Sequence, residues 1–222
     1  MASALGQLLP MAVGIALSPI PIIAVVLMLL TPRAGATGAG FLLGWLVGIV
    51  VIVVVFAAIG SATTLVTGDD KTATGTVKVV LGVVLLALAF RRFRRKVPEG
   101  EQAHLPSWMT HIDKVTPVRA VALGFAVVAI NPKNLALGIV AGMSLASAQL
   151  PMAQEAVVVL VYAVIAGCTV AIPVVGYAVA RQRADGALTS LKAWLVEHND
   201  AVMAVVLLLL GVMLIGKGLS AS

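Results

Sequence analysis

The chain has 222 residues, of which 61% are hydrophobic and 11% are charged, and its mean hydropathy is +1.11. A soluble domain cannot carry so much apolar sequence, because its outer shell must be polar, and the composition therefore predicts an integral membrane protein. The formal net charge of +6 does not indicate nucleic-acid binding, because most basic residues stand in short segments beside apolar runs, where they encode orientation.

Six apolar runs are long enough to cross a hydrocarbon core of about 30 Å, which takes about 20 helical residues. Helices are expected because bare backbone cannot face lipid, and the alternation typical of a barrel strand is absent. The sequence thus predicts an all-α, polytopic membrane protein with one transmembrane domain over residues 1–222. The predicted spans are residues 4–30, 38–61, 74–92, 118–147, 154–180 and 199–219.

The cytoplasmic loop predicted at 93–117 divides the chain into two groups of three spans, about 1–92 and 118–222. Because each group has an odd number of spans, the second enters the membrane from the opposite side, which is the geometry of an inverted repeat. The first span of each group carries a polar, proline-containing interruption at almost the same depth. These interruptions are Ser-Pro-Ile-Pro at 18–21 and Asn-Pro-Lys-Asn at 131–134.

The basic residues predict the orientation. Eleven lie beside the ends of spans one, three and five, three lie toward the opposite side and one lies within span four. Since cytoplasmic segments carry the excess of lysine and arginine, both termini are expected outside the cell. The eleven are Arg33, Arg91, Arg92, Arg94, Arg95, Lys96, Lys114, Arg119, Arg181, Arg183 and Lys192; the others are Lys71, Lys78, Lys217 and the intramembrane Lys133.

The two longer cytoplasmic segments, 91–117 and 181–198, carry apolar residues at helical spacing. Each is interpreted as a short amphipathic helix in the headgroup layer or as a loop folded back on the bundle. The apolar residues are Trp108, Ile112 and Val115 in the first segment and Leu188, Leu191, Trp194 and Leu195 in the second.

No metal site and no cofactor are expected. The three histidines, His104, His111 and His198, fall in the two cytoplasmic segments without enough further ligands. Cys168 is the only cysteine, so a disulfide, a CxxC pair and a cysteine metal cluster are excluded, and it is interpreted as apolar filler.

The prolines of the two interruptions predict helix breaks. Proline removes one N–H and clashes with the carbonyl four residues earlier. Ser and Asn are common N-caps and Pro suits the first helical position, so each interruption should end one half-helix and begin another. The new N-termini would carry partial positive charge near mid-membrane, where anions bind. The carbonyls predicted to be freed are Ile15 by Pro19, Leu17 by Pro21 and Val128 by Pro132.

Lys133 adds a full positive charge at the same depth, which costs about 3 kcal/mol on insertion scales. All nine acidic residues lie in loops or at span ends, so the lysine can bond freed carbonyls and asparagines, lose its proton or meet an anionic substrate. The leading interpretation is a substrate-binding site; the alternative is a structural kink capped by a lysine. The predicted site comprises Ser18, Pro19, Pro21, Asn131, Pro132, Lys133 and Asn134.

Two further patterns are interpreted as structural. Gly40, Gly44 and Gly48 repeat every four residues, which lets helices approach closely, and packing within the chain is favoured over a homodimer face. Gly138 and Gly142 give span four a similar thin edge. Pro173, with Thr169 one turn before it, is interpreted as an ordinary kink.

Six spans with Ser-Pro-Ile-Pro in the first and Asn-Pro-Lys-Asn in the fourth resemble the lysine-exporter (LysE) superfamily, and within it the glycolipid-addressing (GAP) branch, which includes the sulfolipid-addressing type. The resemblance covers essentially the whole chain. It implies an inner-membrane protein of bacteria with lipid-rich, mycolate-type envelopes, implicated in moving glycolipids toward the cell surface. It implies the seven site residues as matching positions and carries no catalytic assignment.

The functional prediction is a transporter or flippase-like exporter of polar or anionic glycolipids. Its expected partners are the lipid bilayer, a glycolipid or other anionic lipid as substrate, and lipid-export machinery. Two alternatives stay open: an exporter of small solutes such as amino acids or ions, and a scaffold for lipid synthesis and export enzymes that binds through 91–96. An enzyme is not expected, because no Walker motif, Ser-His-Asp set or carboxylate pair is present.

Overall fold

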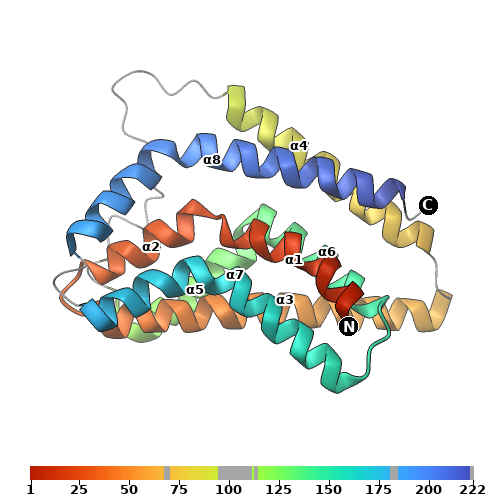
Figure 1. Cartoon of the computed structure of the whole chain (residues 1–222), viewed down its shortest axis with the longest axis horizontal. Coiled ribbons are helices and arrows are strands. Elements are labelled where there is room, and N and C mark those ends of the chain that lie inside the picture. Colours follow the sequence, from red (N-terminus) through yellow and green to blue (C-terminus); the bar gives the residue numbers. More distant parts are fainter. Residues whose placement is uncertain (68–70, 95–111, 113–114, 181–184, 221–222) are drawn as a thin grey trace.

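The computed structural model describes residues 1–67, 71–94, 112, 115–180 and 185–220, and over these residues the fold is all-helical (Figure 1). The α-helices are α1 (Ala2–Ala16), α2 (Pro19–Leu29), α3 (Ala34–Thr67), α4 (Lys71–Arg94), α5 (Pro117–Ile130), α6 (Pro132–Ala146), α7 (Met152–Ala180) and α8 (Asp185–Leu219).

Three helices among the described residues are long and apolar enough to cross a membrane alone: α3, over Ala34–Ala62, α7 and α8. Two bent pairs raise the number of candidate spans to as many as five. The axes of α1 and α2 meet at 52°, and those of α5 and α6 meet at 76°. The helix breaks predicted at Ser18-Pro19 and Asn131-Pro132 are therefore confirmed, and each divides an apolar run into two helices.

The helices form two groups with a third between them. In one group α3 packs along α5, α6 and α7, and in the other α4 packs lengthwise along α8. The pair α1 and α2 lies between the groups, where it contacts α6, α7 and α8 (Figure 1). The α1–α2 break thus lies between helices of both groups.

The last helix is longer than the sequence predicts. Residues 185–198 were expected to form a separate segment before a span at 199–219, but α8 runs without interruption from Asp185 to Leu219. No proline or glycine stands between Leu188 and Leu210, so nothing in this stretch stops helix propagation.

The other predicted amphipathic segment, 91–117, lies partly outside the described residues. Trp108 lies outside them, as do His104 and His111.

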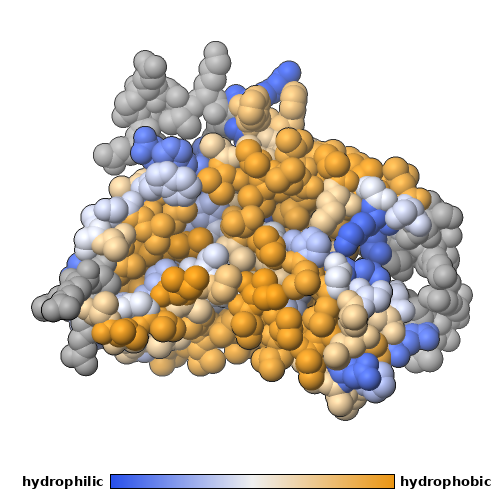
Figure 2. Space-filling model, viewed as in Figure 1, coloured by the Kyte–Doolittle hydropathy of each residue, from blue (hydrophilic) through white to orange (hydrophobic). Residues whose placement is uncertain are grey.

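The surface is apolar in the middle and hydrophilic toward both ends (Figure 2). Large exposed apolar side chains occur along the long helices, including Val51 on α3, Leu160 on α7 and Leu209 on α8. Water would make such exposure unfavourable, whereas hydrocarbon would not. The surface therefore fits a multi-pass membrane protein.

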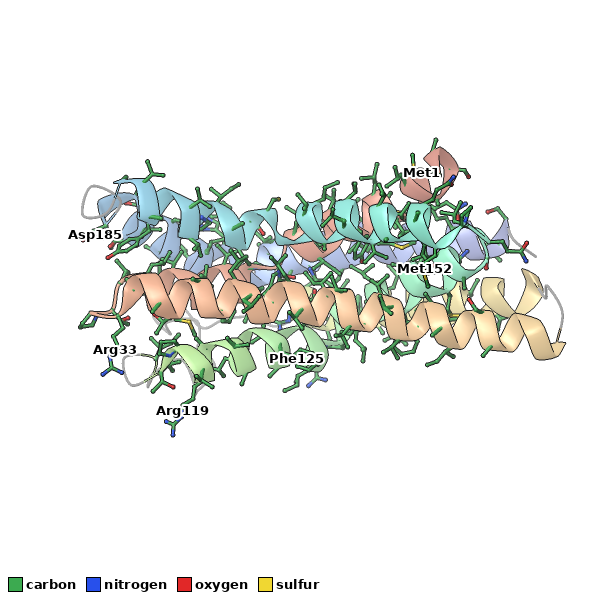
Figure 3. The ribbon with its side chains drawn as sticks, turned by 90° about the horizontal axis from the view of Figure 1, so that it is seen from below. Met1, Arg33, Arg119, Phe125, Met152 and Asp185 are labelled. Carbon is green, nitrogen blue, oxygen red and sulfur yellow. The ribbon has the colours of Figure 1, made fainter. Side chains whose placement is uncertain are left out.

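The two ends of the bundle carry different parts of the chain. Figure 3 shows Arg33, Arg119 and Asp185 at one end and Met1 and Met152 at the other. Arg33 and Arg119 belong to the basic set that the sequence assigns to the cytoplasmic side. These two arginines lie on one side of the apolar middle, as that assignment requires of them.

Glycines bring α3 and α5 into backbone contact. A Cβ atom on Gly40 would lie 2.7 Å from the Pro117 carbonyl oxygen, and one on Gly44 would overlap the Val121 carbonyl. Gly48, also on α3, faces Val128 of α5. The three glycines therefore lie at a helix contact within the chain, and their small size sets the distance between α3 and α5.

Two other helix contacts depend on glycine. On α6, a Cβ on Gly142 would lie 2.6 Å from the Val53 carbonyl oxygen of α3. On α4, a Cβ on Gly82 would lie 2.9 Å from the Gly211 carbonyl oxygen of α8. The α4–α8 contact was not predicted, because single glycines spaced far apart in two spans give no local pattern.

Candidate functional site

The break between α1 and α2 rearranges the backbone hydrogen bonds around Ser18. Ser18 has extended backbone angles, φ −90° and ψ 110°, and its N–H donates to the Ile15 carbonyl over 3.2 Å. In a regular helix this N–H would donate to Gly14. The tightened last turn therefore leaves the Gly14 carbonyl for another donor.

Two distant side chains donate to the end of α1. The Lys133 ammonium donates to the Gly14 carbonyl oxygen over 2.5 Å, and the Thr169 hydroxyl donates to the Ala16 carbonyl oxygen over 2.6 Å. Lys133 comes from the first turn of α6 and Thr169 from α7. The free carbonyls at the buried end of α1 thus accept hydrogen bonds from side chains of two other helices, as a buried helix end requires.

The carbonyls that accept these bonds differ from the predicted ones. The prediction named Ile15 and Leu17 in this segment, but the Ile15 carbonyl accepts the Ser18 N–H, and the side-chain donors go to Gly14 and Ala16. The reason is the short turn before Ser18, whose hydrogen bond spans three residues instead of four. That turn moves the free acceptors by one position.

The break between α5 and α6 is built around Asn131. Its backbone is extended, with φ −74° and ψ 111°, and its side-chain oxygen accepts the Lys133 N–H over 3.1 Å. Pro132 occupies the first helical position. Asn131 therefore caps the N-terminus of α6, as its residue type and the following proline predict.

Asn134 joins the two breaks. The Ser18 hydroxyl donates to the Asn134 Oδ1 over 3.1 Å, and both residues are buried. The Asn134 Nδ2 is also buried and has no hydrogen-bond partner among the described residues. A buried amide without an acceptor is costly, so Asn134 has a donor that is available to another polar group.

The structure brings most of the predicted site residues together. Ser18, Lys133 and Asn134 are buried where α6 meets the α1–α2 break, and Asn131 and Pro132 lie on a neighbouring cavity. Pro19 and Pro21 are buried in the first turn of α2 and shape the break. Sequence reasoning missed Thr169 as a participant, because a threonine near a proline in an apolar span has no marker of its long-range partner.

The cavity has a volume of about 430 Å³ and lies between α2, α4, α5, α6 and α8. Its walls are almost entirely apolar, and it is open on one side, where the exposed Ile130 and Pro132 form part of its lining. Its polar lining residues are Arg92, Asn131 and Lys133. The full lining is Ile20, Leu88, Arg92, Leu123, Ala126, Val127, Ile130, Asn131, Pro132, Lys133, Met203 and Leu207.

A second cavity, of about 400 Å³, adjoins the first. Among the described residues it is lined by Leu88, Arg91, Arg92 and Arg94, so Leu88 and Arg92 line both cavities. The Arg92 guanidinium forms an ion pair with Asp200 of α8. Arg92 is therefore the boundary between an apolar chamber and a strongly basic one.

No group of three or more histidine, cysteine or acidic side chains that could hold a metal ion occurs in the part of the chain that the structure describes. His198 lies against Trp194 instead, with ring centroids 4.9 Å apart and its Nδ1 2.9 Å from the Trp194 carbonyl oxygen. The breaks provide hydrogen-bond donors, among them the side chains of Lys133 and Asn134.

The comparisons with known proteins identify the family. The family model described as Sap, sulfolipid-1-addressing protein, matches residues 8–220. Searches of curated proteins and of solved structures found no match. The matched residues cover both helix breaks and all the long apolar helices. The chain belongs to the sulfolipid-1-addressing protein family, and this membership, with the apolar helices, indicates a membrane protein involved in lipid-related export.

Proposed function

We propose that the protein is a bacterial inner-membrane exporter that moves polar or anionic glycolipids toward the cell surface past the two helix breaks. The observation that carries this proposal is the environment of Lys133. Its side chain is 1% exposed, its ammonium donates to the Gly14 carbonyl, and no described carboxylate forms an ion pair with it.

A buried lysine held by a neutral carbonyl differs from one held by a carboxylate. A carboxylate would cancel the positive charge and would have to be displaced by any anion that replaced it. A carbonyl leaves the net charge in place, so an anionic group that reaches the ammonium gains a charge-assisted hydrogen bond. The α6 N-terminus, capped by Asn131, and the free Asn134 Nδ2 offer further donors for sulfate, phosphate or sugar oxygens.

We propose six spans in two inverted repeats around this site. The first repeat would comprise the α1–α2 pair, α3 and α4, and the second the α5–α6 pair, α7 and α8. Support comes from the packing, in which α3 lies along α5 and α6 while α7 lies along α1 and α2, and α4 pairs with α8. Such repeats commonly meet at broken helices, which hold the substrate near mid-membrane.

Transport then requires the two breaks to separate. The Lys133–Gly14 and Ser18–Asn134 hydrogen bonds hold α6 against α1 and α2 in the observed state. Opening this contact would release the Lys133 ammonium toward a headgroup, while the acyl chains follow the apolar walls. Alternating access commonly proceeds by rocking of one repeat against the other around a fixed substrate site.

The apolar cavity favours a lipid over a small solute. Seven of its twelve lining residues are Ile, Leu, Val or Met. A hydrophilic amino acid or ion in this chamber would lose hydration that only three polar lining residues could replace. A lipid has an apolar part that suits the walls and a polar part that suits Lys133.

The test is Lys133→Met in the native host, with surface-extracted lipid compared with total lipid. Methionine approximates the length and removes the charge. We expect surface glycolipid to fall while total synthesis and the amount of membrane-inserted protein hold. Lys217→Met is the matched control, because Lys217 also donates to a backbone carbonyl of α1, that of Gln7 over 3.2 Å, but at the end of the bundle. Unchanged surface lipid in Lys133→Met, at normal protein level, would overturn the proposal.

A further inference from the structure

We infer that the apolar cavity holds an acyl chain of a lipid whose anionic headgroup, a sulfate or a phosphate, binds Arg92 together with Arg91 and Arg94. This site would load the substrate before it reaches Lys133, and in that sense it rests on the proposed export function. The inference starts from the position of Arg92, which lines both the apolar chamber and the basic one.

The apolar chamber suits a hydrocarbon chain. Its volume of about 430 Å³ falls within the roughly 300–1,000 Å³ typical of small-ligand pockets. Met203 and Leu207 of α8 form a buried wall, and Leu123 and Val127 of α5 lie on the lining as well. A chain in this chamber would exchange lipid contacts for protein contacts with no polar group left unpaired.

The opening of the chamber lies where a lipid chain could enter sideways. Ile130, the last residue of α5, is 78% exposed and also lines the cavity. Helix α5 ends there because Asn131 and Pro132 begin a new helix at 76° to it. The bend thus places the exposed end of α5 on the lining of the cavity, and the proposed entry of the chain is sideways from the bilayer at this point, without crossing the headgroup layer.

The basic chamber suits a tetrahedral anion. Arginine presents five donors in a planar fork that can bind a sulfate or phosphate through two parallel hydrogen bonds. The Arg92 side chain is 30% exposed, and Arg91 and Arg94 are more open to the surface. Three arginines from the last turn of α4 therefore line a space of about 400 Å³ that adjoins the chain cavity.

Asp200 is the internal competitor for this anion. Its carboxylate forms an ion pair with Arg92 across the α4–α8 contact, and its side chain is 26% exposed. A lipid headgroup at Arg92 must share or replace that carboxylate. Loading would therefore loosen the contact between α4 and α8 at the boundary between the two cavities. Removal of the Asp200 charge should strengthen binding of the headgroup, an effect that a purely structural ion pair would not have.

The direct test measures lipid binding to the purified full-length protein in nanodiscs made of phosphatidylcholine. The probes are phosphatidylglycerol and phosphatidylcholine with the same labelled acyl chains, and inorganic sulfate and glycerol phosphate as headgroups without chains. We expect the wild-type protein to bind phosphatidylglycerol at least about tenfold more tightly than phosphatidylcholine, since one charge-assisted pair supplies about that factor. The chain-free anions should bind far more weakly than the lipid.

Four variants separate the contributions. Arg92→Gln should remove the preference for phosphatidylglycerol, and Asp200→Asn should increase it. Ala126→Phe fills the cavity and should weaken binding of both lipids; Ala126→Leu is the milder version if the larger ring prevents folding. Arg119→Gln is the matched control, because it removes the same charge from an exposed arginine that lines neither cavity.

Three results would overturn the inference. These are wild-type binding in Arg92→Gln, an equal loss in Arg119→Gln, or binding of glycerol phosphate as tight as that of the lipid. The outcome is separable from the proposed function. If Lys133→Met loses export while Arg92→Gln binds lipid normally, the loading site fails and the export function stands. If Arg92→Gln and Ala126→Phe lose binding while Lys133→Met exports normally, the loading site stands and the mid-membrane route fails.

Discussion

Ser18 and Asn134 are 116 positions apart, and the Ser18 hydroxyl donates a hydrogen bond to the Asn134 Oδ1 over 3.1 Å in the buried part of the bundle. Ser18 occupies the N-cap position of α2, but its side chain makes no capping bond to that helix. Asn134 lies in the first turn of α6. The hydroxyl of the residue that precedes α2 therefore binds α6 instead of capping its own helix.

This bond should contribute to the stability of the fold in a non-additive way. Ser18→Ala leaves the Asn134 Oδ1 without this donor and should lower the free energy of unfolding by about 1–3 kcal/mol. Replacing both polar groups, in Ser18→Ala/Asn134→Leu, should restore much of that loss, because no buried polar atom of the pair then remains. The measurement is reversible unfolding in one detergent. Ser147→Ala is the control, since the Ser147 hydroxyl donates locally to the Met143 carbonyl at an exposed position. Equal losses in Ser18→Ala and Ser147→Ala would contradict the proposed tie.

Thr169 should matter more than its sequence context suggests. Valine has nearly the shape of threonine, so Thr169→Val removes the hydroxyl that donates to the Ala16 carbonyl and little else. We expect a loss of about 1–3 kcal/mol in stability, because a carbonyl at the end of α1 is left without its donor. Thr169→Ser keeps the hydroxyl and serves as the control.

The amount of glycolipid at the cell surface should follow the stability of these variants. It should be close to wild type in Thr169→Ser and reduced in Thr169→Val. A Thr169→Val protein as stable and active as the serine variant would show that the end of α1 finds its hydrogen bonds elsewhere.

The positions of the two breaks could be predicted from the sequence, because proline and its capping neighbour act on local backbone geometry. The long-range hydrogen-bond partners of the residues at these breaks could not be predicted. The bond between Thr169 and Ala16 joins residues 153 positions apart, and only the packing of α7 against α1 creates it. Lys133 is an intermediate case: the lack of intramembrane acids predicted that it could bond a freed carbonyl, but the choice of Gly14 depends on a tightened turn at Ser18.

Arg92 shows the other limit of sequence reasoning. Its place in a run of basic residues after an apolar span indicated orientation or a scaffold contact, and both interpretations treat the run as one unit. The structure separates Arg92 from its neighbours, because it pairs with Asp200 and lines the apolar cavity. Whether a charge in such a run points toward a cavity depends on the helix that packs beside it, here α8.

The contact between α3 and α5 should not tolerate a side chain at Gly44. A Cβ atom there would overlap the Val121 carbonyl, and backbone atoms cannot move aside without shifting a helix. We expect Gly44→Ala to lower the yield of folded, monodisperse protein severely. Gly176→Ala is the control, because a Cβ on Gly176 of α7 would meet nothing within 4 Å. That variant should be neutral or more stable by up to about 1 kcal/mol, since alanine favours a helix over glycine. Similar yields for the two variants would contradict the close approach of α3 and α5.

The two ends of the bundle should lie on opposite sides of the membrane, with the arginine end in the cytoplasm. The test uses single cysteines at Arg33 and Met152, which lie at opposite ends and are exposed, in a Cys168→Ala background (Figure 3). We expect a membrane-impermeant thiol reagent to label Met152→Cys in intact spheroplasts and Arg33→Cys only after permeabilisation, because lysine and arginine are retained on the cytoplasmic side. The reverse pattern would place both termini in the cytoplasm, whereas labelling of both cysteines in intact spheroplasts would mean that the apolar middle does not separate these ends. The first result would also put Arg92 at the cytoplasmic leaflet, where a newly made anionic lipid would meet it before reaching Lys133.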